Sequence, residues 1–346
     1  MYEYTGAIHI HSNFSDGSGT VEEIASFAGE AGLDFIIITD HNTLRALHEG
    51  YEGWYDKTLV LVGCEINDKE NKNHLLAIGI DEAYSTRLNA KEYVKLVKDA
   101  GGIGIIAHPH EKRNSMEKHP PYPWTEWDTD DFHGIEIWNH MSEWMEGLTE
   151  ENKYNYFVHP LRSISVPPRE TIELWDKLNL KRKVVGIGGV DAHAHKVNLL
   201  GFFEVEVFPY KVLFKSIRTH ILTEEPLEPS KSVSENKEIV LNALKEGRCF
   251  VSNFYRGDAK GFEFYAEKGN EKYFMGDSID SHSDVKIHLK IPGKPAPVKI
   301  IRNGEIYRSL ETEELSLQVD KPGVYRAEVF TGHNGWIFSN HIRIGV

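Results

Sequence analysis

Residues 34–42 read DFIIITDHN, an isoleucine-rich run that ends in the titratable residues Asp40 and His41. Similar apolar runs recur through the first two-thirds of the chain, at residues 6–11, 58–66, 75–80, 103–107, 134–138 and 184–190. Helix-like stretches separate several of them, and two begin with the spacing of a capping box, at Thr20 and at Asn89. Short apolar runs separated by helices are typical of parallel strands buried on both faces.

About seven such units predict an α/β fold, organised as a closed or nearly closed barrel. An open, doubly wound sheet has a similar run of strands and stays an alternative. Two polar and aromatic stretches interrupt the pattern, at residues 110–132 and 141–168. We expect them to be irregular insertions that serve as lids or binding loops, or that only decorate the surface.

The pattern changes from about residue 257. Residues 285–291 and 315–319 alternate strictly between apolar and polar side chains, and Asn303-Gly304 has the signature of a tight hairpin. We therefore predict two domains, a barrel at residues 1–256 and a small antiparallel β-sandwich at residues 257–346.

Composition limits the classes of function. The chain has 346 residues and a formal net charge of -14, which disfavours a stable nucleic-acid partner held through its phosphates. Small phosphorylated substrates stay possible, because bound cations can reverse the local charge. The two cysteines, Cys64 and Cys249, exclude a disulfide scaffold. There is no signal-peptide pattern and no run of about 18 apolar residues, so we expect a cytoplasmic protein without a membrane partner. The oligomeric state stays open.

The residues that carry chemistry are imidazoles and carboxylates placed at the ends of the apolar runs. They are His9, His11, Asp16, Asp40, His41, Glu65, His74, His108, Asp191 and His193. His9 and His11 are two residues apart, so in a strand both rings would project from one face. A single His after a strand is more often a hydrogen-bonded loop residue than a ligand. The whole pattern is different, because imidazole and carboxylate together are the ligand set of Zn, Mn and Fe.

These motifs resemble those of the PHP (polymerase and histidinol phosphatase) family. The resemblance covers about residues 1–256 and is carried by His9-x-His11, Ser15-Asp16-Gly17, Thr39-Asp40-His41-Asn42, Glu65, Ala107-His108-Pro109 and Asp191-Ala192-His193. It implies a distorted (β/α)7, TIM-like barrel that holds two or three divalent metal ions (Zn, Mn or Fe). The C-terminal segments around Pro322 and Trp336 are similar to the β-domain of a branch related to carbaryl esterase.

The resemblance also implies a ligand set. His9, His11, Glu65 and Asp191 would hold the first metal, and Glu65, His74 and His108 the second, with Glu65 bridging. Asp16, His41 and His193 would hold the third, although some family members have His where Asp16 stands. A hydroxide bridging two metals would be the nucleophile, and Asp191, Glu65 and His193 are the predicted catalytic residues.

Substrate contacts are predicted from the two insertions. Arg113 is the leading candidate, because the planar guanidinium fits phosphate oxygens, and Arg162 and Arg169 are weaker ones. His140, His110 and His195 are further candidates for the pocket lining. Trp124 and Trp127 could stack on a base, or could simply cover the mouth of the barrel.

The predicted function is that of a phosphoesterase, which releases phosphate from a small phosphorylated metabolite or nucleotide. The first alternative is a carboxylic ester or carbamate hydrolase with the same metal centre. Arg residues beside the metals would favour phosphate, and an apolar pocket would favour an ester. The second alternative is a non-catalytic, metal-containing binding protein, which an intact ligand set disfavours. A role attached to a polymerase is disfavoured, because no polymerase segment fits in the remaining length.

Overall fold

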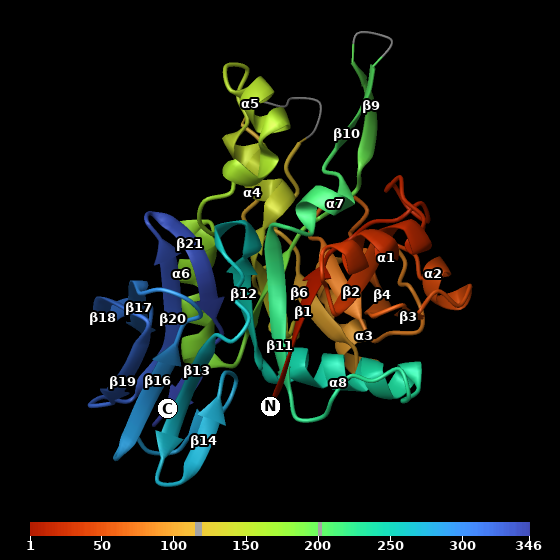
Figure 1. The fold of residues 1–346 in the computed structure, drawn as a ribbon. Coiled ribbons are helices and arrows are strands. Elements are labelled where there is room, and N and C mark those ends of the chain that lie inside the picture. Colours follow the sequence, from red (N-terminus) through yellow and green to blue (C-terminus); the bar gives the residue numbers. More distant parts are fainter. Residues whose placement is uncertain (115–119, 200–202) are drawn as a thin grey trace.

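The computed structural model describes residues 1–114, 120–199 and 203–346. Its central feature is a sheet that curls back on itself (Figure 1). In spatial order the strands of this sheet are β1 (Tyr2–Ile8), β2 (Phe35–His41), β4 (Thr58–Ile66), β5 (Leu75–Ile78), β6 (Ile103–Ile106), β7 (Gly134–Asn139) and β8 (Val185–Gly189). Beyond β8 the chain returns to β1 through a parallel bridge between Ile10 and Ala192. The protein is thus a mixed α/β fold with a sheet rich in parallel pairs, as the apolar runs predicted.

The strand directions differ in one respect from the predicted parallel arrangement. β1, β2 and β4 are parallel, and so are β6, β7 and β8, but β5 runs antiparallel to both of its neighbours. Parallel neighbours need a long crossover, and only residues 67–74 connect β4 to β5. The connection is too short to carry the chain back across the sheet, so β5 pairs directly with the end of β4.

The helices that connect and cover these strands are α1 (Val21–Glu30), α2 (Arg45–His48), α3 (Ala90–Asp99), α4 (His140–Gly147), α5 (Lys153–Val158), α6 (Arg169–Lys181), α7 (Tyr210–Leu213) and α8 (Val233–Glu246), with short 3-10 turns at Pro160–Arg162 and Phe254–Arg256. Both predicted capping boxes are confirmed. The side chains of Thr20 and Asn89 accept hydrogen bonds from the backbone N–H groups of Glu23 and Glu92, whose carboxylates accept bonds from the cap backbone in return. Each box satisfies two N–H groups that the first helical turn leaves unpaired.

The C-terminal segment is built mainly from antiparallel strand pairs, as expected, but it also contains one short parallel pair. Its strands are β13 (Glu263–Lys268), β14 (Glu271–Phe274), β15 (Ser278–Ile279), β16 (Val285–Lys290), β17 (Ala296–Arg302), β18 (Glu305–Thr312), β19 (Glu314–Gln318), β20 (Gly323–Thr331), β21 (Asn334–Ser339) and β22 (Ile342–Ile344). Asn303 and Gly304 form the hairpin between β17 and β18 with φ angles of 54° and 84°, as the tight turn requires. The alternating side chains of β16 point in turn to its own core and to solvent.

The division at residues 256 and 257 stays a prediction, and hydrogen bonds cross it. The antiparallel strands β11 (Ile217–Thr223) and β12 (Cys249–Asn253) follow β1 at the edge of the curled sheet. β12 then pairs with β21, for example Phe250 with Ser339. A short strand, β3 (Gly53–Tyr55), forms a further hairpin with β4. One sheet therefore passes from β1 through β11 and β12 into the C-terminal segment.

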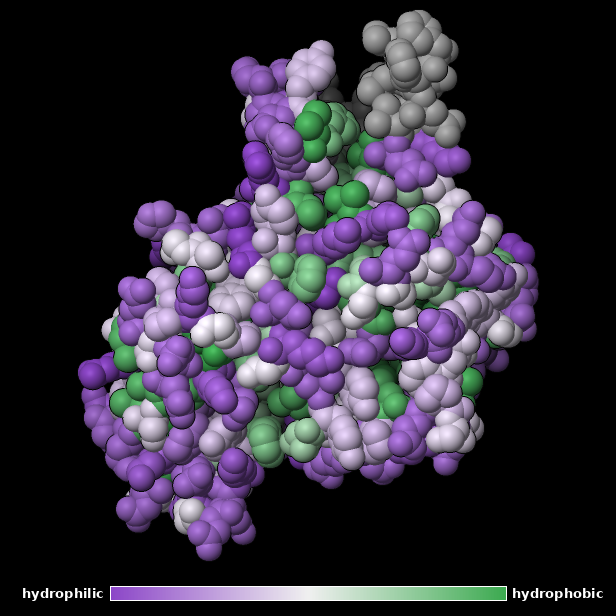
Figure 2. Space-filling view, in the orientation of Figure 1, coloured by the Kyte–Doolittle hydropathy of each residue, from purple (hydrophilic) through white to green (hydrophobic). Residues whose placement is uncertain are grey.

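The insertions differ from expectation, because the second one is largely helical. Residues 141–168 contain most of α4 and all of α5, and Asn139 caps α4 by accepting a hydrogen bond from the backbone N–H of Ser142. Part of the first insertion, including His119, lies outside the described residues. The hairpin of β9 (His195–Leu199) and β10 (Phe203–Val207) forms a second projection beside α5 (Figure 1). Figure 2 shows hydrophobic side chains gathered between these two projections.

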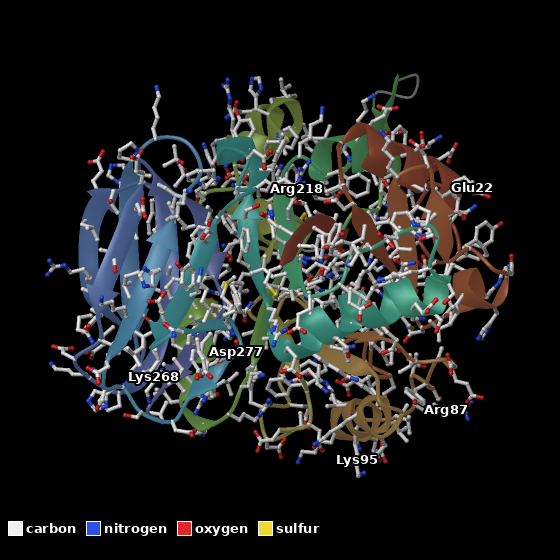
Figure 3. The ribbon with its side chains drawn as sticks, turned by 60° about the horizontal axis from the view of Figure 1, so that its bottom comes forward. Glu22, Arg87, Lys95, Arg218, Lys268 and Asp277 are labelled. Carbon is white, nitrogen blue, oxygen red and sulfur yellow. The ribbon has the colours of Figure 1, made fainter. Side chains whose placement is uncertain are left out.

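The curled sheet has separate inner and outer apolar clusters. Alternate residues of the buried runs, such as Ile37 and Leu61, point inward, whereas Ile36 and Val60 pack against the outer helices. α8 closes the inner cluster at the end where β1 begins, with Leu241 among its contacts (Figures 1 and 3). The opposite end, where β1, β2 and β4 finish, is left for the polar residues. No helix of the described residues is long and apolar enough to cross a membrane.

Candidate metal centre

The nine predicted metal ligands come together at the open end of the curled sheet. They are His9 and His11 after β1, Asp16 in the next loop, His41 at the end of β2, Glu65 in β4, His74 before β5, His108 after β6, and Asp191 and His193 after β8. The reversed direction of β5 explains the place of His74. An antiparallel strand begins at the edge where its parallel neighbours end, so the residue that precedes β5 lies beside Glu65.

The backbone at this edge is unusual. His9, His108 and Asp191 have φ angles of 68°, 28° and 53°, in a region that residues other than glycine rarely adopt. β1 ends at Ile8, so strand alternation does not explain why the rings of His9 and His11 share one site. The turn at His9 brings them together, with ring centroids 5.2 Å apart. Such conformations persist only where surrounding contacts enforce them, and they cluster at functional sites.

Glu65 is the centre of the cluster. Its Oε2 lies 3.2 Å from Nε2 of both His9 and His11 and 3.3 Å from His41 Nδ1. Its Oε1 lies 2.7 Å from His74 Nδ1 and 3.3 Å from His108 Nε2. Each carboxylate oxygen therefore faces a different set of imidazoles, as a ligand shared between two metal ions requires.

Two further carboxylates complete the cluster. Asp191 Oδ1 lies 3.4 Å from His9 Nε2, 3.5 Å from His11 Nε2 and 3.5 Å from His193 Nδ1. Asp16 Oδ1 lies 3.4 Å from His193 Nε2 and 3.6 Å from His11 Nδ1. Asp191 is buried, whereas the Asp16 side chain is 50% exposed. The group around Asp16 therefore lies nearest to solvent.

Divalent metal ions fit this arrangement. Four groups of three or four ligand atoms, each within 4.8 Å of one another, can be formed from the nine residues. Among the described residues, seven buried atoms of the cluster make no hydrogen bond: His9 Nε2, His11 Nδ1 and Nε2, His41 Nδ1, Glu65 Oε2, His74 Nε2 and His108 Nδ1. Buried polar atoms are normally paired, so lone pairs that converge without partners indicate a site for cations.

The pKa shifts of the clustered residues also indicate a site for cations. Burial lowers the pKa of His9, but the carboxylates of Asp191, Glu136 and Glu65 raise it by more, so the pKa of His9 lies well above its usual value. Burial raises the pKa of Glu65, but the surrounding imidazoles hold it well below its usual value. The pKa of His41 falls to about 3, chiefly because of burial, which leaves the neutral imidazole that metals bind. The carboxylates are thus ionised, and the cluster attracts cations, either protons or metal ions.

Sequence analysis missed Glu136, which supports two ligands. His9 Nδ1 donates a hydrogen bond of 2.8 Å to Glu136 Oε1, and the backbone N–H of His108 donates one of 2.8 Å to Oε2. The first bond leaves Nε2 of His9 to face the metal site. Gly189 makes room for this carboxylate, because a Cβ there would lie 1.8 Å from Oε1. The available signal was the single acidic residue within the apolar run GIEIW at residues 134–138.

Asp40 and Tyr210 hold the loops that carry the other ligands. Asp40 accepts hydrogen bonds from the backbone N–H and the hydroxyl of Ser12, at 2.8 and 2.6 Å, and from the hydroxyl of Ser15 at 2.6 Å. These bonds fix the loop that carries Asp16. The Tyr210 hydroxyl lies 2.7 Å from the backbone carbonyl oxygen of His11 and 3.0 Å from that of His193.

The metal centre forms the floor of a cavity of about 940 Å³. Arg113 lines this cavity, but Glu111 accepts hydrogen bonds from its Nε and Nη2 at 2.9 and 2.7 Å. The Arg113 guanidinium lies over the ring of Tyr122, which stacks on His74 at 5.2 Å between ring centroids. His195 also lines the cavity and stacks on His193.

The other predicted substrate residues lie outside this cavity. His140 is fully buried, and burial lowers its pKa to about 3. His110 hydrogen-bonds the Thr171 hydroxyl at 2.9 Å and stacks on Trp127. Arg162 lines an adjoining cavity of about 370 Å³.

Arg169 is 92% exposed and pairs with Glu173. Neither predicted tryptophan lines the main cavity, and Trp124, within the first insertion, is buried. The spacing of these residues in the chain did not indicate which helix or loop would turn them away from the site.

Part of the chain that carries this cluster is similar to known proteins. Residues 7–117, which carry seven of the nine ligands, match the model of the PHP domain. This segment is therefore similar to the PHP domain. Part of it is 30% identical over 118 residues to the uncharacterised protein MJ1587 of Methanocaldococcus jannaschii, covering 30% of this chain and 66% of that protein. Another match is 31% identical over 80 residues to the phosphoribosyl 1,2-cyclic phosphate 1,2-diphosphodiesterase of Eggerthella lenta, covering 22% of this chain and 30% of the enzyme.

The chain thus spans just under two-thirds and about one-third of these two relatives. Among solved structures, a two-domain protein of Bacteroides vulgatus containing a predicted PHP-like metal-dependent phosphoesterase is 15% identical, with a TM-score of 0.49 over 98% of this chain and 95% of that one. An amidohydrolase of Chromobacterium violaceum is 15% identical, with a TM-score of 0.34 over 54% of this chain and 87% of that one. The matched segment contains Glu65 and the candidate ligands before it, together with His74 and His108, while Asp191 and His193 come from later in the sequence.

Proposed function

We propose that the protein is a metal-dependent hydrolase, and most specifically a phosphoesterase. The observation that carries this proposal is the convergence of six imidazoles and three carboxylates on the floor of a cavity that opens to substrate. We also propose that the curled sheet is the distorted (β/α)7, TIM-like barrel of the PHP fold, because the bridge between Ile10 and Ala192 joins its first and last strands. Catalytic groups of such barrels lie where the strands end.

The candidate ligands form four overlapping groups, which match the predicted sets only in part. His9, His11 and Asp191 form one group, Asp16, His41 and His193 lie together with His11 in another, and Glu65 joins His9 and His108 or His41 and His74. Divalent metals bound there would lower the pKa of water to about 7 and neutralise charge on a phosphoryl group. Zn, Mn and Fe all accept this mixture of ligands, and two or three ions would be bound.

The protein groups have separate tasks in this proposal. Glu65 holds the imidazoles of both faces of the site in place through its two oxygens. Asp191, with Asn139 Nδ2 at 3.4 Å from its Oδ2, accepts the proton from the attacking water. His193, whose Nδ1 lies 3.5 Å from Asp191 Oδ1, lines the cavity and would pass this proton on to the leaving alcohol. Arg113, braced by Glu111, contacts the phosphoryl oxygens.

Two lines of support favour a phosphate ester as the scissile group. The PHP domain match covers the first seven ligands, and one curated relative that shares part of this segment is a phosphodiesterase. A small phosphorylated metabolite or nucleotide would be the substrate. The cavity wall supports a second candidate function, because its residues are mainly apolar, and an apolar pocket suits a carboxylic ester or carbamate.

A hydrolysis screen separates the two. Metal-loaded protein is tested with phosphomonoesters, phosphodiesters, nucleotide bisphosphates, p-nitrophenyl acetate and aryl carbamates, each with and without a chelator. Phosphate release that the chelator abolishes is the expected result. Ester or carbamate cleavage without phosphate release would replace the first candidate by the second. Absence of all turnover, from protein shown by metal analysis to carry two or more ions, would contradict both.

A further inference from the structure

We propose that the cavity above the metal centre binds a substrate whose uncleaved part is large, uncharged and apolar, as in an aryl or long-chain alkyl ester. The inference rests on the proposed function, because it concerns the part of the substrate that the same site does not cleave. It applies equally to a phosphate and to a carboxylic ester, since the wall contacts only the apolar body.

The wall of the cavity is apolar, whereas its floor is formed by the polar residues of the candidate metal centre. Its side chains come from α4, α5 and the end of β10, and include Met141, Trp144, Leu148, Phe157 and Phe208. The Trp144 ring packs edge-on against those of Phe157 and Phe208, at 5.3 and 5.0 Å between centroids. Apolar walls with a few polar groups at one end are typical of sites that bind the body of a small molecule.

Phe208 is held in place by its backbone. Its φ angle is 56°, a region that bulky side chains rarely adopt, and its carbonyl oxygen accepts a hydrogen bond of 3.0 Å from the backbone N–H of Ala194. Ala194 directly follows the ligand His193. The same turn therefore sets a metal ligand and an aromatic residue of the wall, which fixes the distance between the reacting group and the apolar body.

The cations of the cavity are already paired. Among the described residues that line it, the Lys and Arg side chains are Arg113 and Lys153. Glu111 accepts two hydrogen bonds from Arg113, and Glu150 accepts one of 2.7 Å from Lys153. A substrate with a second phosphate or another charged group would lose water without gaining an ion partner, which is costly in an apolar site. One reacting group on a neutral body suits this wall.

Helix α5 supplies the remaining observation. None of its six residues is buried, and Tyr154, Phe157 and Val158 are 77%, 49% and 70% exposed. Phe157 and Val158 line both the main cavity and the adjoining cavity that contains Arg162. Figure 2 shows hydrophobic side chains on the face between the projections of α5 and of β9 and β10. A helix this short gains little from its own hydrogen bonds, so an apolar body bound against it would supply the packing that it lacks.

Two measurements on metal-loaded, full-length protein test the inference. The first is a fluorescence titration with N-phenyl-1-naphthylamine, an uncharged apolar probe, on the wild type and on Phe157→Ala, Phe157→Leu and Ile306→Ala. Ile306 is a matched control, since it is 60% exposed on β18, in the C-terminal segment. The second is the rate of hydrolysis of n-alkyl phosphates from ethyl to octyl, with glycerol phosphate as the polar comparison.

The probe should bind with one-to-one stoichiometry. Phe157→Ala should weaken probe binding about tenfold, because the probe loses contact with about half of the apolar surface of a phenylalanine. Phe157→Leu should restore most of the affinity, because leucine again offers apolar surface at this position. Ile306→Ala should bind the probe like the wild type. Along the phosphate series kcat/KM should rise about fourfold per methylene, the factor that corresponds to about 0.8 kcal/mol for each buried CH₂.

The outcomes separate this inference from the proposed function. If no phosphate is cleaved but the probe binds and Phe157→Ala weakens it, the phosphoesterase proposal fails and the apolar site stands. If glycerol phosphate or a nucleotide is cleaved as fast as octyl phosphate, the phosphoesterase stands and the apolar site is overturned. Equal probe binding to the wild type and Phe157→Ala also overturns it.

Discussion

Replacing Asp176 by Asn should strongly destabilise the protein, because Asp176 joins α6 to the C-terminal strands through a buried ion pair. Its oxygens accept hydrogen bonds from Arg326 Nε and Nη2, at 2.7 and 2.8 Å, and from His341 Nε2 at 2.9 Å. The side chains of Asp176 and Arg326 are 5% and 2% exposed. In Asp176→Asn the Arg326 guanidinium would keep Glu328 as a partner, at 2.6 Å, but would lose the carboxylate that binds it through two hydrogen bonds.

The magnitude follows from this burial. Removing one member of a buried pair leaves the other charge desolvated, which typically costs about 3–5 kcal/mol. Because Glu328 still neutralises part of the charge, we expect a loss near the lower end, about 3 kcal/mol in the free energy of unfolding. Replacing both members, in Asp176→Leu with Arg326→Met, should cost less than Arg326→Met alone, because Asp176 is then no longer left as an unpaired buried carboxylate and only Glu328 loses its partner.

The assay is urea unfolding followed by tryptophan fluorescence and by circular dichroism. Two probes are needed because a chain of this length can unfold in more than one step. The control is Glu173→Gln on the same helix, whose partner Arg169 is 92% exposed. This exposed pair should contribute almost nothing. If Asp176→Asn is no less stable than Glu173→Gln, the buried pair does not hold the two segments together and the reasoning is wrong.

Four further predictions follow from the structure. Arg326 and His341 outweigh burial and hold the pKa of Asp176 below its usual value, so the stability difference between wild type and Asp176→Asn should be full above about pH 4 and shrink as the pH falls further; urea midpoints at pH 7, 4 and 3 would show it. Glu65→Ala should lose bound metal and activity together while its circular dichroism is unchanged, and full metal content with normal turnover would exclude the assigned site. Glu136→Gln should lower metal affinity about 10–100-fold, measured by competition with a chelator, because Gln is a poorer acceptor for the His9 N–H; unaltered affinity would contradict its role. Gly189→Ala should have the same effect, since its Cβ displaces the Glu136 carboxylate, and a variant with wild-type affinity would show that Glu136 can move without consequence.

Local signals predicted much of the fold correctly. The capping boxes at Thr20 and Asn89 both start helices, and the apolar run at residues 58–66 is β4 over its full length. These signals are local, since a cap involves residues within one turn and a buried strand needs a continuous apolar run. The direction of β5 was not predicted, because it depends on the length of the connection after β4 rather than on the residues of β5 itself.

The convergence of the candidate ligands was also predictable, for a reason of topology. Residues that follow parallel strands of one sheet meet at one edge, so the motifs at His9, His41 and Asp191 had to converge. The supporting residues were harder to find. Glu136 lies in a strand of apolar residues, and its role depends on the N–H groups of His9 and His108, which come from other strands.

The amino-acid sequence by itself therefore determined the class of fold, the main helices and strands, and the chemical identity of the candidate ligands. These depend on short-range patterns and on side-chain chemistry that folding does not change. Only the tertiary structure decided which side chains surround the candidate site. The apolar wall, the pairing of Arg113 with Glu111, and the exclusion of His110 and Arg162 from the cavity all arise from contacts between distant segments. Such contacts depend on how helices and loops pack, and no local pattern encodes the direction in which an exposed arginine or histidine finally points.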